Sequence, residues 1–515
     1  MLKSLDQLYS LFPQKNLLLP NVHVTGISYH TDTVAPGHIF VAIPGFRHDG
    51  HSYAELAVAK GAIAVIAARP LNIDAPVIIV QDPRVALAKV SHWFFDYPAN
   101  SINMIGVTAS NGKTTTTFMI DHILAQAFPT TGLIGTVIVK DGKQAHQADL
   151  TTPQSRDLIE MLAIMRRNGC SHVTMEVSSA GLELERVHGI RYNIAAFNNI
   201  SREHIDFHGS FENYNKHKSR LIRELDHKAL AILNADDLQV IQVKNMTTAQ
   251  VITYSLKGEE ADITISDISL EFGHSSYILN IPRPIVLHGH KLNPGKINVT
   301  LKVLGLHNVY NSVVAILAAV AAGVDIQMAA CSLFTFGGVE RRFQLIYDGQ
   351  YKIIDDHFAN SGNIDISLET MGLMNYNRLI LLTAIRGNRG SIVNKENAEA
   401  IVRWADKLKL REILVTDSSD FVGGKDLVTD EERKAFIGTL EEHGLVCLYS
   451  PDLMTAAKRA LQRVSSGDIL LLAGPQGMDF GAQVILPMVA KTHSPEQQSE
   501  IMQVLASRVA GNILT

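Results

Sequence analysis

The stretch that most constrains the fold is residues 102–117, which read Ile-Asn-Met-Ile-Gly-Val-Thr-Ala-Ser-Asn-Gly-Lys-Thr-Thr-Thr-Thr. Its apolar first part, 102–107, predicts a short buried strand, and the small polar residues 108–112 predict a tight turn. Lys113 and Thr114 then open an amphipathic stretch that predicts a helix. A strand, a tight turn and a helix N-terminus form a phosphate-binding arrangement, because backbone N–H groups converge there and the helix dipole favours an anion.

The spacing of this loop departs from the strict phosphate-loop pattern. That pattern places a glycine five residues before Gly112, where this chain has Val107, and the nearest glycine, Gly106, is displaced by one residue. An ordinary strand-to-helix turn with a lysine in the first helical turn is therefore the alternative interpretation. In a phosphate site, Lys113 would supply a point charge and Thr114 a hydroxyl ligand for magnesium.

The length and charge of the chain limit the class of protein to which it can belong. With 515 residues it is too long for one core, and a prior of about 150 residues per domain suggests about three domains. The net charge of -5, from 46 basic and 51 acidic residues, argues against a nucleic-acid partner. The longest apolar run, 313–324, is shorter than the roughly 18 residues that a membrane span needs.

The cell compartment expected from the sequence is the cytoplasm. The N-terminal residues contain no uninterrupted apolar segment, so we expect no signal peptide. The three cysteines, Cys170, Cys331 and Cys447, lie far apart and have neither a metal-type spacing nor the pattern of a disulfide framework. They are typical of buried or incidental thiols in a reducing compartment.

Strand and helix patterns alternate along three stretches, 1–98, 99–335 and 336–515. The first predicts a small α/β domain. The second predicts a mostly parallel sheet with helices on both faces, including a single strand at 132–139 and an added antiparallel patch at 252–303. The third predicts another α/β alternation, similar to a dinucleotide-type fold but without its glycine fingerprint.

Polar side chains follow two of the predicted strands. Glu176 ends the apolar run 172–177, and ligands gather at the carboxyl ends of parallel strands. A carboxylate beside a phosphate loop is a candidate magnesium ligand, with a surface glutamate as the alternative. After the next strand, alternate positions hold His204, Asp206 and His208. Three potential ligands so close together suggest a site more than a single histidine would.

Two helices carry residues for which both a structural and a functional reading exist. Lys216 and Lys218 lie on a helix expected to begin near Phe211, where lysines more often form a solvated face. Asn308 and Asn311, one turn apart at the start of a later helix, would either cap that helix or hydrogen-bond a purine. Capping is the favoured interpretation.

Taken together, these stretches resemble the Mur ligase family, most closely its MurE branch, the UDP-N-acetylmuramoyl-tripeptide synthetases. The resemblance covers nearly the whole chain and rests on nine motifs in family order. They are Pro44-Gly45 with Asp49-Gly50-His51; Ser110-Asn111-Gly112-Lys113-Thr114-Thr115; Thr151-Thr152-Pro153; Met175-Glu176-Val177-Ser178-Ser179; Ser201-Arg202-Glu203-His204-Ile205-Asp206-Phe207-His208-Gly209; Tyr214 with Lys218; Asn234-Ala235-Asp236-Asp237; His307-Asn308-Val309-Tyr310-Asn311; and Arg341-Arg342-Phe343.

The resemblance implies a three-domain α/β architecture with a central phosphate-loop-type, mostly parallel sheet and a C-terminal Rossmann-like domain. Residues 1–98 would bind a nucleotide sugar, 99–335 ATP, and 336–515 the incoming amino acid. The implied activity is that of an ADP-forming acid–amino-acid ligase. A peptide carboxylate attacks the γ-phosphate of ATP, and an amine then attacks the resulting acyl phosphate. The default acceptor is UDP-N-acetylmuramoyl-L-Ala-D-Glu, a peptidoglycan precursor.

The resemblance also assigns roles to individual residues, with Lys113, Lys218 and His204 as the catalytic ones. For ATP it implies Ser110, Asn111, Gly112, Lys113, Thr114, Thr115, Asn308 and either Arg341 or Arg342. For Mg²⁺ it implies Thr114, Glu176, His204 and a carbamylated Lys218. For the muramyl-peptide it implies Thr151, Thr152, Ser178 and Arg186.

The sequence departs from the family pattern mainly at the substrate ends. Ala109 replaces a loop glycine; His30-Thr31-Asp32 replaces Asp-Ser-Arg near the uracil; Asp356-His357-Phe358-Ala359-Asn360 replaces Asp-Tyr-Ala-His; Asp417-Ser418-Ser419-Asp420-Phe421 replaces Asp-Asn-Pro-Arg; and Gly474-Pro475-Gln476-Gly477-Met478-Asp479 replaces Gly-Lys-Gly-His-Glu. The last two motifs read the charged far end of meso-diaminopimelate. A site that keeps this ligand would not lose both charged partners, so we expect another amine donor.

Two alternatives follow from these departures. The protein would be either a Mur-type ligase with an acceptor outside the cell wall, or a pseudoenzyme that binds nucleotide without turnover. Ala109 and the missing C-terminal histidine favour the pseudoenzyme. The residues that favour a ligase are the intact Lys113, Thr114, Glu176, His204 and Lys218.

Overall fold

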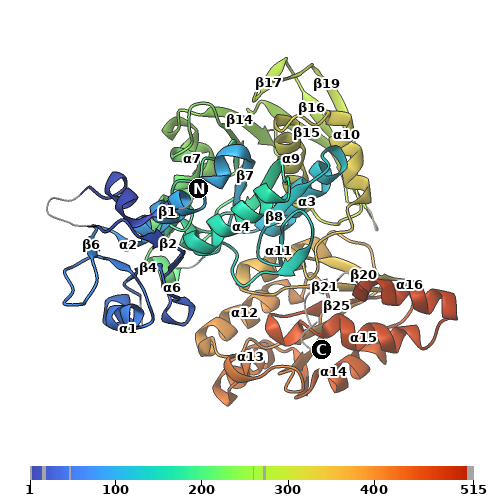
Figure 1. Ribbon diagram of the computed structural model, residues 1–515. Coiled ribbons are helices and arrows are strands. Elements are labelled where there is room, and N and C mark those ends of the chain that lie inside the picture. The colour runs from blue at the N-terminus through green and yellow to red at the C-terminus, as the bar shows by residue number, and fades with distance from the viewer. Residues whose placement is uncertain are drawn as a thin grey trace.

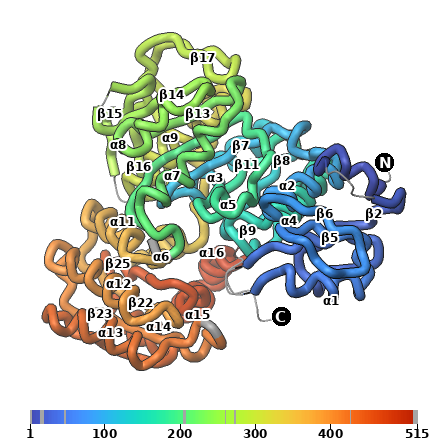
Figure 2. Tube along the Cα trace, turned by 90° about the vertical axis from the view of Figure 1, so that its left-hand side faces the viewer, coloured from blue at the N-terminus to red at the C-terminus, as the bar shows by residue number. Residues whose placement is uncertain are grey.

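The computed structural model describes residues 3–13, 19–45, 48–203, 205–258, 260–270, 274–506 and 508, leaving aside the side chains of Ile205, Asp206 and Lys425. Three main sheets organise these residues, each with its own helices. Figure 1 shows the first part of the chain in blue at the left and the last part in orange and red at the bottom. Figure 2, turned by 90°, shows them as separate lobes that flank the middle part.

The first sheet has four parallel strands in the order β3-β4-β5-β6. They are β3 (Gly26–Ser28), β4 (His38–Val41), β5 (Ala64–Ala67) and β6 (Val77–Ile79), with helices α1 (Ala54–Ala59) and α2 (Pro83–Phe94). Helix α2 begins after Asp82, whose carboxylate accepts from the backbone N–H of Arg84 at 2.8 Å. This part is the α/β unit that the sequence predicts.

The second sheet contains eleven strands in the order β10-β9-β8-β11-β7-β12-β13-β14-β15-β16-β19. Its parallel part is formed by β8 (Thr131–Ile134), β11 (His172–Glu176), β7 (Asn103–Thr108), β12 (Ile194–Phe197), β13 (Leu230–Asn234), β14 (Gln250–Ser255) and β15 (Ile263–Ser269). The strands β16 (Ser275–Ile281) and β19 (Gly295–Leu301) pair antiparallel and extend it, whereas β17 (Ile285–Leu287) and β18 (His290–Leu292) form a separate two-stranded hairpin. The antiparallel addition predicted at 252–303 is confirmed for β16 and β19, but it is wrong for β14, which pairs parallel with both of its neighbours.

Helices cover both faces of this sheet, as the sequence predicts. Alternate residues of β7 point to opposite faces. Ile105 packs in one core with α3 (Lys113–Ala127) and α9 (Leu306–Ala321), and Met104 packs in the other with α4 (Ser155–Arg167) and α7 (Phe211–Arg223). The short helices α5 (Ser179–Glu183) and α8 (Leu238–Ile241) follow β11 and β13, and α10 (Ile326–Ser332) follows α9.

The single strand predicted at 132–139 is wrong. The chain forms β8 and then β9 (Ile138–Lys140), which turn back on each other in antiparallel register and continue into β10 (Ala145–Gln147). The turn closes through the backbone N–H of Gly135, which donates to Ile138 at 3.1 Å. An added Cβ at Gly135 would lie 2.6 Å from Glu176 Oε1, so the glycine lets this turn approach the carboxylate.

The third sheet has six strands in the order β20-β21-β25-β22-β23-β24, parallel except for β20. They are β20 (Gln344–Asp348), β21 (Lys352–Asp356), β22 (Leu379–Ala384), β23 (Glu412–Thr416), β24 (Val446–Ser450) and β25 (Ile469–Ala473). The helices are α11 (Ser361–Met371), α12 (Gly390–Ala405), α13 (Asp430–Glu442), α14 (Leu453–Leu461), α15 (Gly481–Ala490) and α16 (Pro495–Ala506). Within the described residues, no helix combines the length and apolar character that a bilayer crossing requires.

Candidate active site

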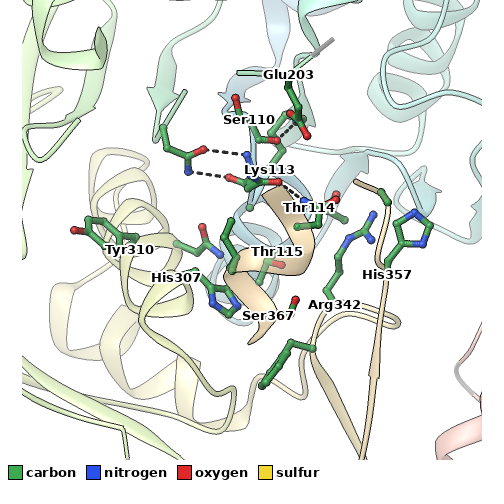
Figure 3. A pocket seen from close by; sticks show the side chains of 18 of the residues that line it. Ser110, Lys113, Thr114, Thr115, Glu203, His307, Tyr310, Arg342, His357 and Ser367 are labelled. Atoms are coloured by element: carbon green, nitrogen blue, oxygen red, sulfur yellow. Dashed lines mark hydrogen bonds between the residues drawn. The ribbon is translucent and has the colours of Figure 1, made fainter. Parts of the chain in front are cut away.

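A cavity of about 950 Å³ opens where the carboxyl ends of β7, β11 and β13 face the third sheet. The walls on the second-sheet side come from the loop Ser110–Thr115, from Glu176 and from residues 234–239. The opposite walls include Arg342, Asp356, His357, Asn363 and Arg386. In Figure 3, Lys113 and Glu203 lie above the opening, Arg342 and His357 at its right, and His307 and Tyr310 at its left.

The loop after β7 has the conformation that a phosphate site needs. Gly112 adopts a left-handed backbone with φ of 88°, and α3 begins at the next residue. The ammonium of Lys113 folds back over the loop and donates to the carbonyls of Ala109 and Ser110, at 2.8 and 3.0 Å. Ala109 is not among the described residues with positive φ, so its methyl group is tolerated where the family has glycine.

We predict that Gly112→Ala weakens nucleotide binding by about tenfold. The left-handed backbone disfavours a side chain by about 1–2 kcal/mol, and an added Cβ would lie 2.4 Å from Asn311 Oδ1. Titration with ATP, together with thermal melting, would measure both effects. Gly209→Ala is the matched control, because that glycine also has positive φ but no atom within 4 Å of an added Cβ. Equal loss of affinity in both variants would contradict the prediction.

Glu176 is the centre of a polar cluster beside this loop. Its side chain is fully buried and accepts three hydrogen bonds: from Thr114 Oγ1 at 3.0 Å, from the backbone N–H of Thr136 at 2.7 Å and from Thr136 Oγ1 at 3.1 Å. A carboxylate with a threonine hydroxyl is the hard-oxygen set that Mg²⁺ prefers, completed by phosphate and water. The described residues contain no group of three His, Cys, Asp or Glu placed to hold a metal.

Lys218 lies on the other side of the same loop. It extends from α7 into the protein interior, is 1% exposed, and donates to the carbonyl of Ala109 at 2.6 Å. Burial, helped by the nearby charge of Lys113 and opposed by Glu203, holds the pKa of the Lys218 ammonium well below its usual range. Lys218 is buried whereas its neighbour Lys216 is exposed, so the solvated-face interpretation is wrong for Lys218.

The histidine-rich motif is only partly described. His204 and the side chain of Asp206 lie outside the described residues. His208 is buried, pairs with Glu183 at 2.6 Å through Nδ1 and contacts Ser179 Oγ at 2.9 Å through Nε2. It does not line the cavity and serves to hold α5.

The two asparagines of α9 do not cap it, so the capping interpretation is wrong. The helix begins at Leu306 after Gly305. Asn308 is buried, donates to the carbonyl of Leu304 at 2.8 Å and accepts from Asn311 Nδ2 at 3.1 Å. Only Asn311 of the pair lines the cavity.

The adjacent arginines Arg341 and Arg342 point in different directions. Arg342 lines the cavity, and burial lowers the pKa of its guanidinium. Arg341 is buried away from the cavity and binds Asp479 and the carbonyls of Gly474 and Pro475. The structure therefore favours Arg342 as the residue that faces a nucleotide.

Helix α11 connects the third sheet to the loop. Asn360 caps this helix by accepting from the backbone N–H of Asn363, and its Nδ2 donates to Glu203 at 2.5 Å. Asn363 Nδ2 donates to Asn111 Oδ1 in the loop itself. The sequence reasoning missed Glu203, Asn360 and Asn363 as site residues. An asparagine before a helix signals a cap but not what else its side chain contacts.

The residues assigned to the muramyl-peptide lie next to Glu176. Thr152 Oγ1 donates to the backbone carbonyl of Glu176 at 2.9 Å, and Arg186 donates to the carbonyl of Thr152 at 2.9 Å. Ser178 caps α5. Thr151 lines the cavity and accepts from Thr136 Oγ1 at 3.1 Å. Of these four residues, Thr151 alone is part of the cavity lining.

The comparisons with known proteins agree with this site. The family model described as "Mur ligase middle domain" matches residues 107–319, and "Mur ligase family, catalytic domain" matches residues 23–94. The UDP-N-acetylmuramoyl-L-alanyl-D-glutamate--2,6-diaminopimelate ligases of Geobacillus thermodenitrificans and Geobacillus kaustophilus are 32% and 33% identical to this chain; each alignment covers 88% of this chain and 90% of the relative.

Solved structures show the same fold. One ligase of that name aligns with a TM-score of 0.68 at 22% identity and covers 96% of this chain and 100% of its own. MurF from Acinetobacter baumannii aligns with a TM-score of 0.65 at 20% identity, covering 94% and 99%. The three-part α/β architecture is thus shared over nearly the whole chain.

Proposed function

Because the chain belongs to the Mur ligase family, we propose that it joins an amino acid to the peptide carboxylate of UDP-N-acetylmuramoyl-L-Ala-D-Glu, forming ADP and phosphate. This would place it in the synthesis of peptidoglycan precursors. The observation that carries the proposal is the convergence of Lys113, Thr114, Glu176 and Lys218 on one loop at the cavity.

Phosphoryl transfer needs positioning and charge neutralisation more than covalent help from the protein. Lys113 would neutralise the β- and γ-phosphates at the start of α3, and Arg342 would add a second positive charge from the third sheet's side. Thr114 and Glu176 would hold Mg²⁺, which would supply positive charge against the phosphates during the transfer. The acceptor carboxylate attacks the γ-phosphorus, and the bond from that phosphorus to the bridging oxygen of ADP breaks.

Lys218 would act as a carbamate. The deprotonated amine can attack carbon dioxide, which gives the N-carboxylate and releases one proton. The side chain thereby becomes a carboxylate that suits a magnesium site. The lowered pKa of Lys218 supports this role, because only the deprotonated amine is nucleophilic.

The amine donor that we propose is not meso-diaminopimelate, although the relatives named above are ligases for it. The carboxylates at the positions that read its far end already have partners in this chain. Asp420 accepts from the backbone N–H groups of Leu453 and Met454, at 2.8 and 3.1 Å, at the start of α14. Asp479 is held by Arg341. A donor with a charged far end would therefore find neither of its expected partners.

The test of this proposal is ADP release with Mg-ATP and the UDP-muramyl dipeptide against a panel of amino acids, with the products identified by mass spectrometry. We expect one amino acid without the second charged end to be used at least about tenfold better than meso-diaminopimelate, since lost charge-assisted pairs reduce affinity by at least that factor. Efficient use of meso-diaminopimelate would contradict the donor assignment. Nucleotide binding without any product would contradict the ligase function.

A further inference from the structure

A group of buried charges lies behind the cavity wall and has no part in the chemistry above. Its core is formed by Arg341, Asp355 and Arg508, which are 4%, 0% and 2% exposed. Glu340 and Asp479 lie at its ends. Charged side chains are rarely buried unless they are paired, because an unpaired buried charge is costly. Breaking these pairs would therefore be unfavourable, and the contacts hold their segments in place.

Arg508, two residues beyond α16, reaches into the third sheet. One guanidinium nitrogen pairs with Asp355 at the end of β21, and the other donates to Gln344 Oε1 at 2.9 Å. Its Nε lies 3.8 Å from Glu340. Arg508 therefore ties β21 to the segment that runs from residue 340 into β20.

Asp355 is shared between two arginines. Its Oδ1 lies 3.6 Å from Arg341 Nε, while its other oxygen pairs with Arg508. Arg341 also binds Asp479 and the carbonyls of Gly474 and Pro475. The three side chains thus fasten residues 340–341 to two neighbouring strand ends.

The backbone around Arg342 explains why such fastening is needed. Arg341 and Phe343, on either side of it, both adopt left-handed conformations, with φ of 58° and 53°. Residues other than glycine keep such conformations only where the surroundings fix them. The backbone N–H of Phe343 donates to Asp356 at 2.9 Å, so the segment is held at both flanks while Arg342 faces the cavity.

We propose that Arg508, acting through Asp355 and Arg341, is a positioning residue that holds Arg342 toward the phosphates of the nucleotide. This inference rests on the proposed function in one respect: it takes Arg342 to contact the nucleotide. We call Arg341, Asp355 and Arg508 the arginine brace.

A mutant cycle separates positioning from general stability. The probe is the non-hydrolysable β,γ-imido analogue of ATP with Mg²⁺, and its affinity is measured by calorimetry for the full chain, R342A, R508Q and the double variant. We expect R342A to lower the affinity about tenfold and R508Q to lower it about fivefold. In the R342A background, R508Q should lower the affinity by less than about twofold, because the effects of two residues that act through one another are not additive.

The controls address folding and charge. R411Q removes an exposed arginine of the same part of the chain, whose partner Asp406 is also exposed, and should leave affinity unchanged. R508K keeps the charge but not the planar fork, so we expect an intermediate affinity. If R508Q alone does not fold, the pair D355N/R508Q removes both partners of the buried contact and should still bind the analogue weakly.

Two results would overturn the inference: an equal loss from R508Q in both backgrounds, or wild-type affinity in a folded R508Q or D355N/R508Q variant. A wild-type chain that binds the analogue but forms no amide product would contradict the ligase proposal alone, and the cycle would still decide the role of the brace. A wild-type chain that does not bind the analogue would contradict both.

Discussion

Replacing Lys218 by alanine is expected to lower the rate of ADP formation by about 10²–10³-fold, the range seen when one preorganised group is removed from a charge-stabilising site. The side chain is buried against the loop carbonyl of Ala109, and burial lowers the pKa of its ammonium. As a carbamate it would supply a carboxylate to the metal site. Alanine removes both the carboxylate and the contact with the loop. Steady-state ADP release with saturating substrates measures the effect.

Chemical rescue distinguishes this role from a loss of folding. Formate or acetate added to the Lys218→Ala enzyme can occupy the space left by the side chain, and we expect partial recovery of the rate. Lys216→Ala is the matched control, because Lys216 is exposed on the same helix α7 and should leave the rate unchanged with or without acetate. Unaltered turnover in Lys218→Ala would contradict the carbamate. A wild-type chain that binds nucleotide but shows no turnover would instead favour a nucleotide-binding protein without ligase activity.

Sequence patterns predicted the strands that are apolar along most of their length. The apolar run at 469–473 is a central strand, and the stretch 412–416 forms β23. The segment 361–371 was not predicted as a helix, because Ser361-Gly362-Asn363 reads as a loop although Ile364, Leu368 and Met371 form a buried stripe. The prediction of one strand at 132–139 failed because apolar residues lie on both sides of the turn between β8 and β9, which Gly135 allows.

The candidate site was predictable where it follows strand ends. Glu176 and the loop after β7 meet because neighbouring parallel strands end at the same edge of the sheet. The contacts between the second and third parts of the chain have no comparable sequence pattern. Asn360 contacts Glu203, 157 positions away in the sequence, and Asn363 contacts Asn111, 252 positions away. Likewise, no sequence pattern distinguishes Arg341 from Arg342, because the backbone conformation decides which one faces the cavity.

Replacing Glu176 by glutamine is expected to raise the Mg²⁺ concentration needed for half-maximal ADP formation and to lower the maximal rate, each by about 10–100-fold, as is usual when a metal site loses a supporting group. Glutamine keeps the shape of the side chain but removes its charge. Its amide N–H₂ replaces one of the two oxygens and so faces either Thr114 Oγ1 or the N–H of Thr136, which donate to different oxygens of the carboxylate. Mg²⁺ titrations at fixed ATP measure both changes.

Asp121→Asn is the matched control for this prediction. Asp121 is also buried, lies on helix α3 next to the loop, and pairs with Lys140 at 2.8 Å and with Thr131 at 2.7 Å, but it does not line the cavity. Its loss should lower the melting temperature without changing the Mg²⁺ dependence, because the charge it removes lies outside the cavity. A Glu176→Gln enzyme whose Mg²⁺ dependence matches that of the wild type would mean that this carboxylate only fixes the turn at Thr136. The ion would then be held by other groups at the phosphate loop.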